Sequence, residues 1–186
     1  MSADPSNGLT LILGGARSGK SAYAEQIGRE SGKPVLFVAT AAALDDEMRE
    51  RIQRHREARP HEWQTLEAPV NVGSILVSEA FQFQAEVIIL DCVTLLVSNL
   101  LLVLPEDAAI EQVMKNVQTE IDFLLEAQTR IGGQWLIVSN EVGLGVVPPY
   151  PLGRMYRDAL GWANQRLARA ADRVIFMVAG IPMVIK

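Results

Sequence analysis

The stretch LTLILGGARSGKS, residues 9–21, decides the fold of this chain. An apolar run typical of a buried β-strand enters a glycine-rich turn, and residues 22–27 continue as a helix. The turn reads G-x-x-x-x-G-K-S, the phosphate-binding loop (P-loop). Glycines let its backbone N–H groups converge on phosphate oxygens, and the helix start adds unpaired N–H groups and the positive end of a dipole. The stretch therefore predicts a nucleotide-binding α/β domain.

Three polar side chains have expected roles around this loop. Lys20 would reach the β- and γ-phosphates of ATP or GTP, and the Ser21 hydroxyl would bind Mg²⁺. Asp91 ends the apolar strand Val87–Leu90, and a carboxylate at the carboxyl edge of a parallel sheet can orient the same ion. Asp91 could also cap the helix that follows, and the two roles are compatible. We therefore expect a Mg²⁺ site formed by Ser21 and Asp91.

Short apolar runs alternate with helical segments along the chain. Continuous apolar runs indicate strands buried on both faces, so the alternation favours a mostly parallel sheet flanked by helices. Apolar spacing predicts helices at Ile110–Leu124 and Met155–Ala171. A turn before Met183–Ile185 predicts an antiparallel edge strand. The predicted parallel strands are Leu9–Leu13, Val35–Ala39, Val87–Leu90, Trp135–Ser139 and Val174–Val178.

Composition narrows the class of protein. The length of 186 residues predicts one domain over residues 1–186, with a disordered tail at 1–8. A net charge of −5 argues against a nucleic-acid-binding surface. The single cysteine, Cys92, fits a reducing compartment and a small buried residue. The apolar run Val93–Leu104 is too short to span a bilayer, and the N-terminus lacks the apolar core of a signal peptide. We expect a cytoplasmic protein.

A charged helix is predicted between about Asp45 and Pro60. Arg51, His55 and Arg59 are spaced by four residues, so one helical face presents Arg–His–Arg. Three interpretations are open. The helix is a solvated surface element, its arginines clamp phosphate, or neutral His55 also attacks a phosphorus while the arginines stabilise the transferred group.

Motifs spread from Leu9 almost to Lys186 resemble the adenosylcobinamide kinase/adenosylcobinamide-phosphate guanylyltransferase family. They occur in the same order as in the family and without large insertions. In this sequence they are Gly14–Ser21, Ala39–Ala41, Asp45–Met48, Arg51–Pro60 with Trp63, Asp91–Thr94 with Asn99–Leu100, Ser139–Pro148, and Arg157–Asp158 with Asn164–Ala168.

The resemblance implies a RecA-like P-loop fold and a bifunctional enzyme of cobalamin nucleotide-loop assembly. Such enzymes phosphorylate the aminopropanol hydroxyl of adenosylcobinamide with ATP or GTP. They then transfer GMP from GTP to adenosylcobinamide phosphate, giving adenosylcobinamide-GDP and pyrophosphate. The guanylyl group rests on a histidine that corresponds by motif to His55, and family members form trimers. The catalytic residues implied are His55 and Lys20.

The resemblance also implies which residues contact nucleotide. They belong to the P-loop, to the end of the second predicted strand and to the end of the charged helix, with Glu67 and the strand-terminal Asp91 in addition. They are Gly14, Gly15, Ala16, Arg17, Ser18, Gly19, Lys20, Ser21, Ala39, Thr40, Ala41, Arg56, Glu57, Ala58, Arg59, Glu67 and Asp91.

Two departures from the family pattern bear on the site. Arg54 precedes His55 where some relatives have a second histidine, and Tyr150–Pro151 enlarges a proline-rich loop. Glu141 follows a strand and could be a base for the corrinoid hydroxyl, a neighbour of the Mg²⁺ ligands or part of a structural turn. We expect the corrinoid near Val146–Tyr150. The alternative functions are a plain P-loop kinase and a nucleotide-gated regulatory module.

Overall fold

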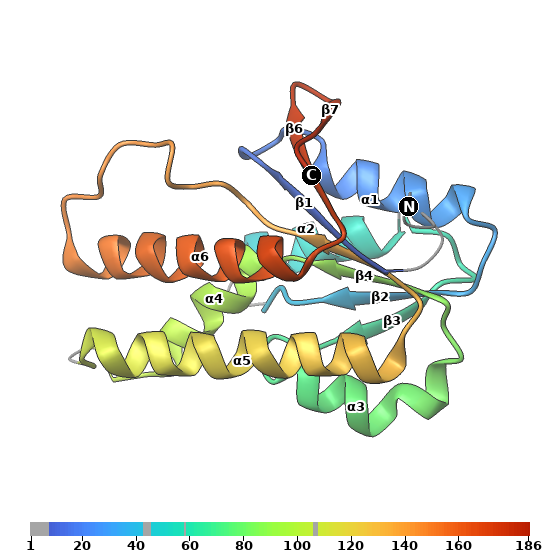
Figure 1. Ribbon diagram of the computed structural model, residues 1–186, viewed down its shortest axis with the longest axis horizontal. Helices are drawn as coiled ribbons and strands as arrows, with labels where there is room; N and C mark the ends of the chain where they lie inside the picture. Colours follow the sequence, from blue (N-terminus) through green and yellow to red (C-terminus); the bar gives the residue numbers. More distant parts are fainter. Residues whose placement is uncertain (1–7, 43–45, 58, 106–107) are drawn as a thin grey trace.

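The computed structural model describes residues 8–42, 46–57, 59–105 and 108–186. Within these ranges the side chains of residues 47–48, 51–52, 55 and 79–83 lie outside the description. The described strands form one seven-stranded sheet in the order β3-β2-β4-β5-β1-β6-β7 (Figure 1). The strands are β1 (Gly8–Gly14), β2 (Val35–Ala39), β3 (Gln64–Glu67), β4 (Val87–Asp91), β5 (Gln134–Val138), β6 (Arg173–Val178) and β7 (Ile181–Val184). The helices are α1 (Lys20–Glu30), α2 (Asp46–Glu57), α3 (Val72–Phe83), α4 (Val93–Leu102), α5 (Ile110–Ile131) and α6 (Pro151–Ala170).

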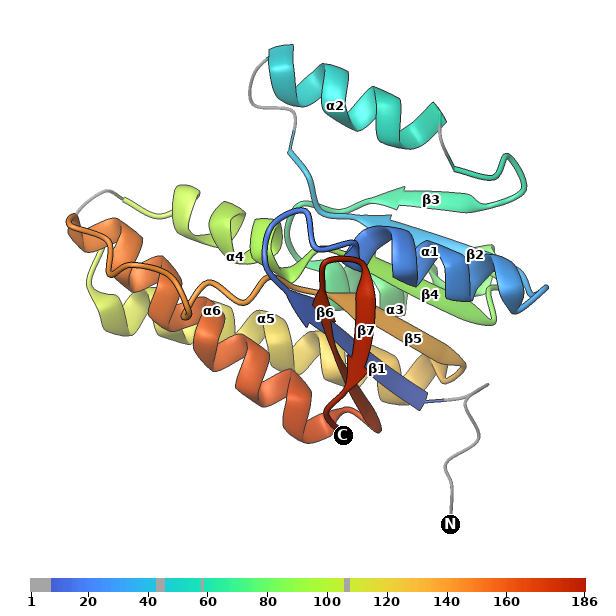
Figure 2. The same cartoon turned by 90° about the horizontal axis from the view of Figure 1, so that it is seen from above.

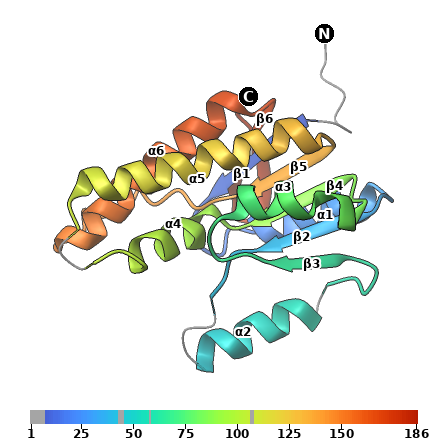
Figure 3. The same ribbon diagram turned by 90° about the horizontal axis from the view of Figure 1, so that it is seen from below.

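Two helical layers cover the sheet. Helices α3, α4, α5 and α6 lie on one face (Figure 3), where their apolar side chains pack against alternate residues of the strands, such as Leu9 and Leu11 of β1. Helix α1 covers the other face, where Ala24 packs near Ile12 and Phe37. Helix α2 lies apart, beyond the edge strand β3 (Figure 2). Burial on both faces explains why the strands read as continuous apolar runs.

The predicted architecture is confirmed. The five predicted strands pair in parallel within the sheet, and β7 pairs antiparallel with β6 at its edge. The apolar residues whose spacing predicted the helix Ile110–Leu124 are largely buried in α5, although the first of them, Ile110, is 41% exposed. Gly8 belongs to β1 rather than to the expected tail, and the rest of that tail lies outside the described residues. Among the described helices, none combines the length and apolar composition that a bilayer crossing requires.

Strand order brings the ends of four strands together at one edge. Strand β5 lies between β1 and β4, and β2 follows β4. The Cα partners run from Ile12 to Val138, from Val138 to Asp91 and from Asp91 to Ala39. Adjacent strands lie about 4.8 Å apart, so the end of β4 is about 10 Å from the end of β1. The P-loop, Asp91 and the start of the connection to α2 therefore share this carboxyl edge.

Candidate active site

The P-loop closes tightly between β1 and α1. Gly14 has φ 152° and Gly19 has φ 95°. A Cβ added at Gly14 would lie 2.6 Å from the carbonyl oxygen of Met177. Side chains at either position would therefore strain the turn. Gly15, Ala16 and Arg17 are exposed, as the mouth of a phosphate cradle requires.

Lys20 occupies the interior of this loop. Its side chain is 6% exposed, and its Nζ donates hydrogen bonds to Gly15 O at 2.5 Å and to Ser18 Oγ at 3.4 Å. Burial lowers the pKa of Lys20 from its ordinary value, while the charges of Cys92 and Asp91 act in the opposite direction. A cation held in a cradle of backbone N–H groups is suited to binding phosphate.

Two oxygen donors could hold Mg²⁺ beside the loop. Ser21 lies partly exposed in the first turn of α1, and Asp91 ends β4 close enough for its charge to act on Lys20. A hydroxyl and a carboxylate are hard ligands that fit Mg²⁺, with phosphate oxygens and water as the rest. No cluster of three or more His, Cys, Asp or Glu suited to a metal occurs in the described residues. Cys92, not Asp91, is the N-cap of α4.

The end of β2 is joined to the end of β4. Thr40 is fully buried. Its hydroxyl donates to Cys92 O at 2.7 Å and accepts from Cys92 N at 2.8 Å. Asn99 Nδ2 donates to Thr40 O at 2.8 Å. Because its hydroxyl is already bonded within the chain, Thr40 holds the edge in shape, between the buried Ala39 and the partly exposed Ala41.

Helix α2 carries several predicted residues away from the P-loop. It connects the parallel strands β2 and β3, so it runs antiparallel to both. His55 lies in its last turn, about 14 Å along the axis from Asp46. The backbone of His55 is described and its side chain is not, while Ala58 lies outside the described residues. Exposed Glu57 precedes Ala58. Arg56, also in this turn, forms an ion pair with Glu67 at 3.3 Å, so the last turn lies beside β3 (Figure 2).

Arg59 packs against β2, close enough to the carboxyl edge for the charge of Asp91 to act on it. Its guanidinium stacks on the Phe37 ring at 3.6 Å from the centroid. Burial lowers the pKa of Arg59, and the charges of Glu25, Asp91 and Glu67 oppose that shift. Its Nε and Nη1 are buried and have no hydrogen-bond partner. Unsatisfied buried donors are costly, so this guanidinium is well suited to an added anionic oxygen.

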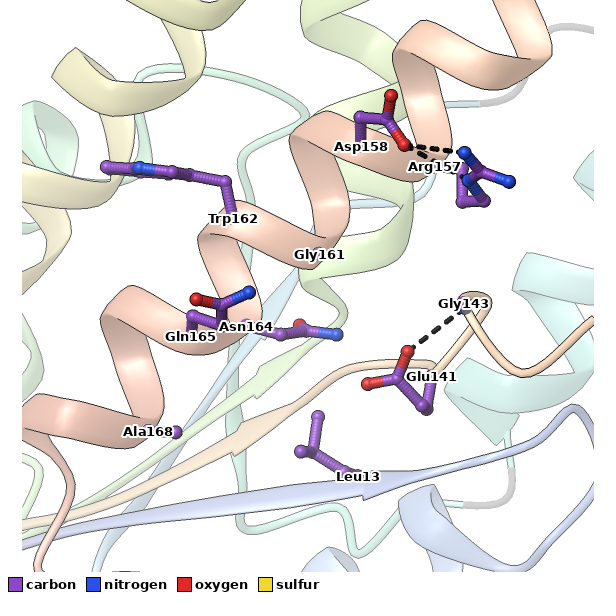
Figure 4. A pocket seen from close by; sticks show the side chains of 10 residues that line it. All are labelled: Leu13, Glu141, Gly143, Arg157, Asp158, Gly161, Trp162, Asn164, Gln165 and Ala168. Carbon is purple, nitrogen blue, oxygen red and sulfur yellow. Dashed lines mark hydrogen bonds and ion pairs between the residues drawn. The ribbon is translucent and has the colours of Figure 1, made fainter.

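The turn after β5 contains Glu141, for which the sequence left three roles open, and it is held by Asn164, to which the sequence assigned no role in binding. Glu141 N donates to Gly14 O at 3.0 Å, which fixes this turn against the P-loop. Ser139 Oγ donates to Asn164 Oδ1 at 2.7 Å, and Asn164 Nδ2 donates to Asn140 O at 3.0 Å. Glu141 and α6 residues, among them Arg157, border a cavity (Figure 4). The helical spacing of small and polar residues along α6 is the sequence feature that could have indicated which of its residues line the cavity.

Sequence comparison identifies the family. The family described as cobinamide kinase / cobinamide phosphate guanyltransferase matches residues 10–185. The chain belongs to this family. Two curated relatives are each named as a bifunctional adenosylcobalamin biosynthesis protein. CobP of Pseudomonas aeruginosa is 46% identical over 176 residues, which cover 95% of this chain and 96% of the relative. CobU of Salmonella typhimurium is 40% identical over 183 residues, which cover 96% and 99%.

Membership of the cobinamide kinase/guanyltransferase family confirms the predicted resemblance and the predicted enzyme class, a kinase and nucleotidyltransferase of cobalamin biosynthesis. The solved structure of the flagellar accessory protein FlaH from Methanocaldococcus jannaschii matches with a TM-score of 0.52 at 14% identity. The match covers 96% of this chain and 78% of FlaH. At that identity the similarity concerns the fold alone, and it agrees with the predicted RecA-like P-loop architecture.

Proposed function

We propose that this protein carries out both reactions at the carboxyl edge of its sheet. It phosphorylates the aminopropanol hydroxyl of adenosylcobinamide with ATP or GTP. It then transfers GMP from GTP to adenosylcobinamide phosphate, which yields adenosylcobinamide-GDP and pyrophosphate. The buried Lys20 within the P-loop is the observation that carries this assignment, because a desolvated ammonium is stabilised by an anionic ligand such as a nucleotide phosphate.

The proposed kinase step uses the groups at the P-loop. Lys20 and the N–H groups of Gly14–Ser21 bind the β- and γ-phosphates and neutralise charge that develops during transfer. Ser21 and Asp91 would hold Mg²⁺, which would neutralise charge on the phosphate oxygens. Arg59 supplies unpaired N–H donors at the same edge. Geometry and charge, rather than covalent chemistry, therefore account for this step.

The proposed guanylyl transfer uses His55 as nucleophile. A ring nitrogen attacks the α-phosphorus of GTP, a P–N bond forms and pyrophosphate leaves. The corrinoid phosphate then attacks the phosphoramidate and frees His55. A covalent intermediate lets one site handle two bulky substrates in turn. Further proposed nucleotide contacts lie near this end of α2, either in the sequence or in the fold. They are Arg56, Glu57, Ala58, Arg59 and Glu67.

Guanylyl transfer requires α2 to change position in this proposal. The last turn of α2 lies beside β3, where Arg56 pairs with Glu67. Both residues are about half exposed, and such surface pairs contribute roughly 0–1 kcal/mol. Breaking this pair therefore costs little. Bound nucleotide would replace Glu67 as the partner of Arg56 and draw the last turn of α2 toward the P-loop.

Labelled GTP tests the covalent step. A label on the α-phosphorus should leave an acid-labile, alkali-stable adduct on the wild-type protein, and a label on the γ-phosphorus should leave none. His55→Ala should lose the adduct and keep the kinase reaction. His61→Ala is the matched control, because His61 is the other histidine and lies exposed beyond α2. An active enzyme without an adduct would show direct transfer between GTP and the corrinoid phosphate.

A further inference from the structure

A cavity of about 500 Å³ lies between α6 and the turn that follows β5 (Figure 4). It sits on the α6 face of the sheet, and α2 lies on the other side of the P-loop (Figure 2). The described residues that line it are Leu13, Glu141, Gly143, Arg157, Asp158, Gly161, Trp162, Asn164, Gln165 and Ala168. Apolar and polar groups thus share its wall, as in sites for small organic ligands.

The cavity adjoins the P-loop directly. Leu13 on its wall immediately precedes Gly14, the first P-loop residue. Glu141, also on the wall, is tied to Gly14 O by its backbone N–H at 3.0 Å. The buried Asn164 holds the same turn from α6. A ligand in the cavity would therefore lie next to the phosphates rather than at a separate site.

Gly161 keeps the cavity open. A Cβ built at this position would meet no atom within 4 Å. The backbone of Gly161 is helical, and glycine inside a helix costs about 1 kcal/mol relative to alanine. Neither packing nor backbone conformation calls for a glycine here. The space in front of it is the feature that a side chain would remove.

Two charged side chains suit the chemistry of the acceptor. Glu141 Oε1 accepts from Gly143 N at 3.0 Å, and the other carboxylate oxygen points toward α6 (Figure 4). Arg157 is the one cation among the described lining residues, and two hydrogen bonds of 3.0 Å join it to Asp158 Oδ1. A carboxylate can take the proton of an alcohol, and a guanidinium can bind the phosphate monoester that results.

The segment that leaves the cavity wall at Gly143 carries exposed apolar side chains. The chain that follows Gly143 exposes Leu144 by 80%, Val146 by 95%, Val147 by 58% and Tyr150 by 60%. Exposed apolar side chains gathered in one segment are a candidate binding surface. A large, partly apolar ring could lie on this segment while a polar arm enters the cavity beside it.

We propose that the cavity is the acceptor subsite and that Glu141 is the base of the kinase step. The hydroxyl-bearing arm of the corrinoid enters beside Gly161. Glu141 takes the hydroxyl proton as the oxygen bonds to the γ-phosphorus, and the bond from that phosphorus to the leaving nucleoside diphosphate breaks. Arg157 then binds the new phosphate. This assignment rests on the function proposed above, and it names the place where the acceptor of that function binds.

Filling the cavity tests the assignment. Gly161→Leu should raise the KM for cobinamide about tenfold or more, while the KM for nucleotide and the yield of the labelled GTP adduct formed without acceptor stay at the wild-type level. Ala170→Leu is the matched control, because it adds similar bulk at an exposed position of α6 outside the cavity lining. Thermal unfolding should show both variants folded. An unchanged KM for cobinamide in folded Gly161→Leu would overturn the subsite.

Two further variants separate the roles of the charged groups. Glu141→Gln should lower kcat of the kinase reaction about a hundredfold or more at unchanged nucleotide affinity. Arg157→Gln should raise the KM for cobinamide phosphate more than the KM for cobinamide. Equal effects on both acceptors would remove the phosphate role of Arg157. Failure of the wild-type protein to use either acceptor would instead overturn the proposed function, so the two failures are distinguishable.

Discussion

Lys20 shows how one residue combines a cost in folding with a use in binding. Its ammonium is buried and donates hydrogen bonds to oxygens of its own loop. Burying a charge is unfavourable unless an opposite charge or hydrogen bonds compensate it. The phosphates of a nucleoside triphosphate supply the opposite charge, so nucleotide binding should stabilise the loop.

Lys20→Met should therefore separate stability from activity. Methionine keeps much of the volume and removes the buried charge, so the melting temperature should be unchanged or higher. Kinase turnover should fall about a hundredfold or more, because the cation that neutralises the transferred phosphoryl group is gone. Lys33→Met is the control, since Lys33 lies before β2 at the opposite edge of the sheet in a surface pair with Glu86. Kinase assays and thermal unfolding check both; retained turnover in Lys20→Met would contradict the role of the loop.

The position of the Arg59 side chain could not be predicted from the sequence. Its spacing from Arg51 and His55 predicted one face of one helix. In the structure α2 ends at Glu57, and Arg59 turns back to stack on Phe37. Helical periodicity predicts the direction of a side chain only for residues within the helix. Pro60 disfavours helical backbone at Arg59, so the helix ends before this residue. The contact of Arg59 with the sheet is a tertiary contact that no local pattern encodes.

At the scale of elements, the apolar strands were predictable and β3 was not. Strand β3 is Gln64–Glu67, four residues with only one large apolar side chain. It pairs with β2 on one side only, and an edge strand does not need the continuous apolar run that indicates a buried strand. The cavity beside α6 was likewise hidden, because its lining comes from β1, the turn after β5 and α6. Its walls meet only when the sheet is assembled.

The N-terminus of helix α3 is capped by a carboxylate from helix α5. Glu120 of α5 is 4% exposed, and it accepts hydrogen bonds from Asn71 N at 3.1 Å and Val72 N at 2.7 Å. Asn71, the N-cap residue, makes no side-chain cap of its own. Glu120 thus satisfies N–H groups that a helix start leaves unpaired and complements its dipole.

Glu120→Ala should lower the free energy of unfolding by about 3 kcal/mol, since buried N–H groups lose a charged acceptor. Burial raises the pKa of Glu120, so the folded state binds its proton at higher pH than the unfolded chain. The contribution of Glu120 to the free energy of unfolding of the wild-type protein therefore increases as the pH falls from neutrality. The difference in free energy of unfolding between wild type and Glu120→Ala should widen over the same range. Denaturant unfolding measures both effects. Glu126→Ala on the same helix, in an exposed pair with Arg130, should change stability little.

At the scale of the whole molecule, the sheet ends in an exposed apolar edge. Strand β7 and the residue after it expose Ile181 by 66%, Met183 by 50%, Val184 by 64% and Ile185 by 63%. The hairpin of β6 and β7 projects from the body (Figure 1). An apolar edge strand invites pairing with another chain unless something covers it. We propose that this edge contributes to the homotrimer implied by the family resemblance.

Charges on this edge should dissociate the proposed trimer. Wild-type protein should sediment at three times the monomer mass. The double variant Ile181→Lys, Val184→Lys should sediment as a monomer, because lysines at an edge strand oppose pairing. Ala170→Lys, at an exposed site of α6, should keep the trimer. Analytical ultracentrifugation measures all three, and a trimer that survives the double variant would place the interface elsewhere.

The same hairpin touches the P-loop, since Gly180 N donates to Ser18 O at 3.0 Å. The chain also has a single native thiol, Cys92, whose pKa burial raises to about 11. A thiol introduced at Ala179, exposed in the turn of this hairpin and outside the residues of the proposed trimer interface, would therefore be the preferred target of a maleimide dye at neutral pH. Because the hairpin contacts the P-loop, we expect the fluorescence of the attached dye to change when nucleotide binds. That change would report nucleotide binding without any corrinoid assay.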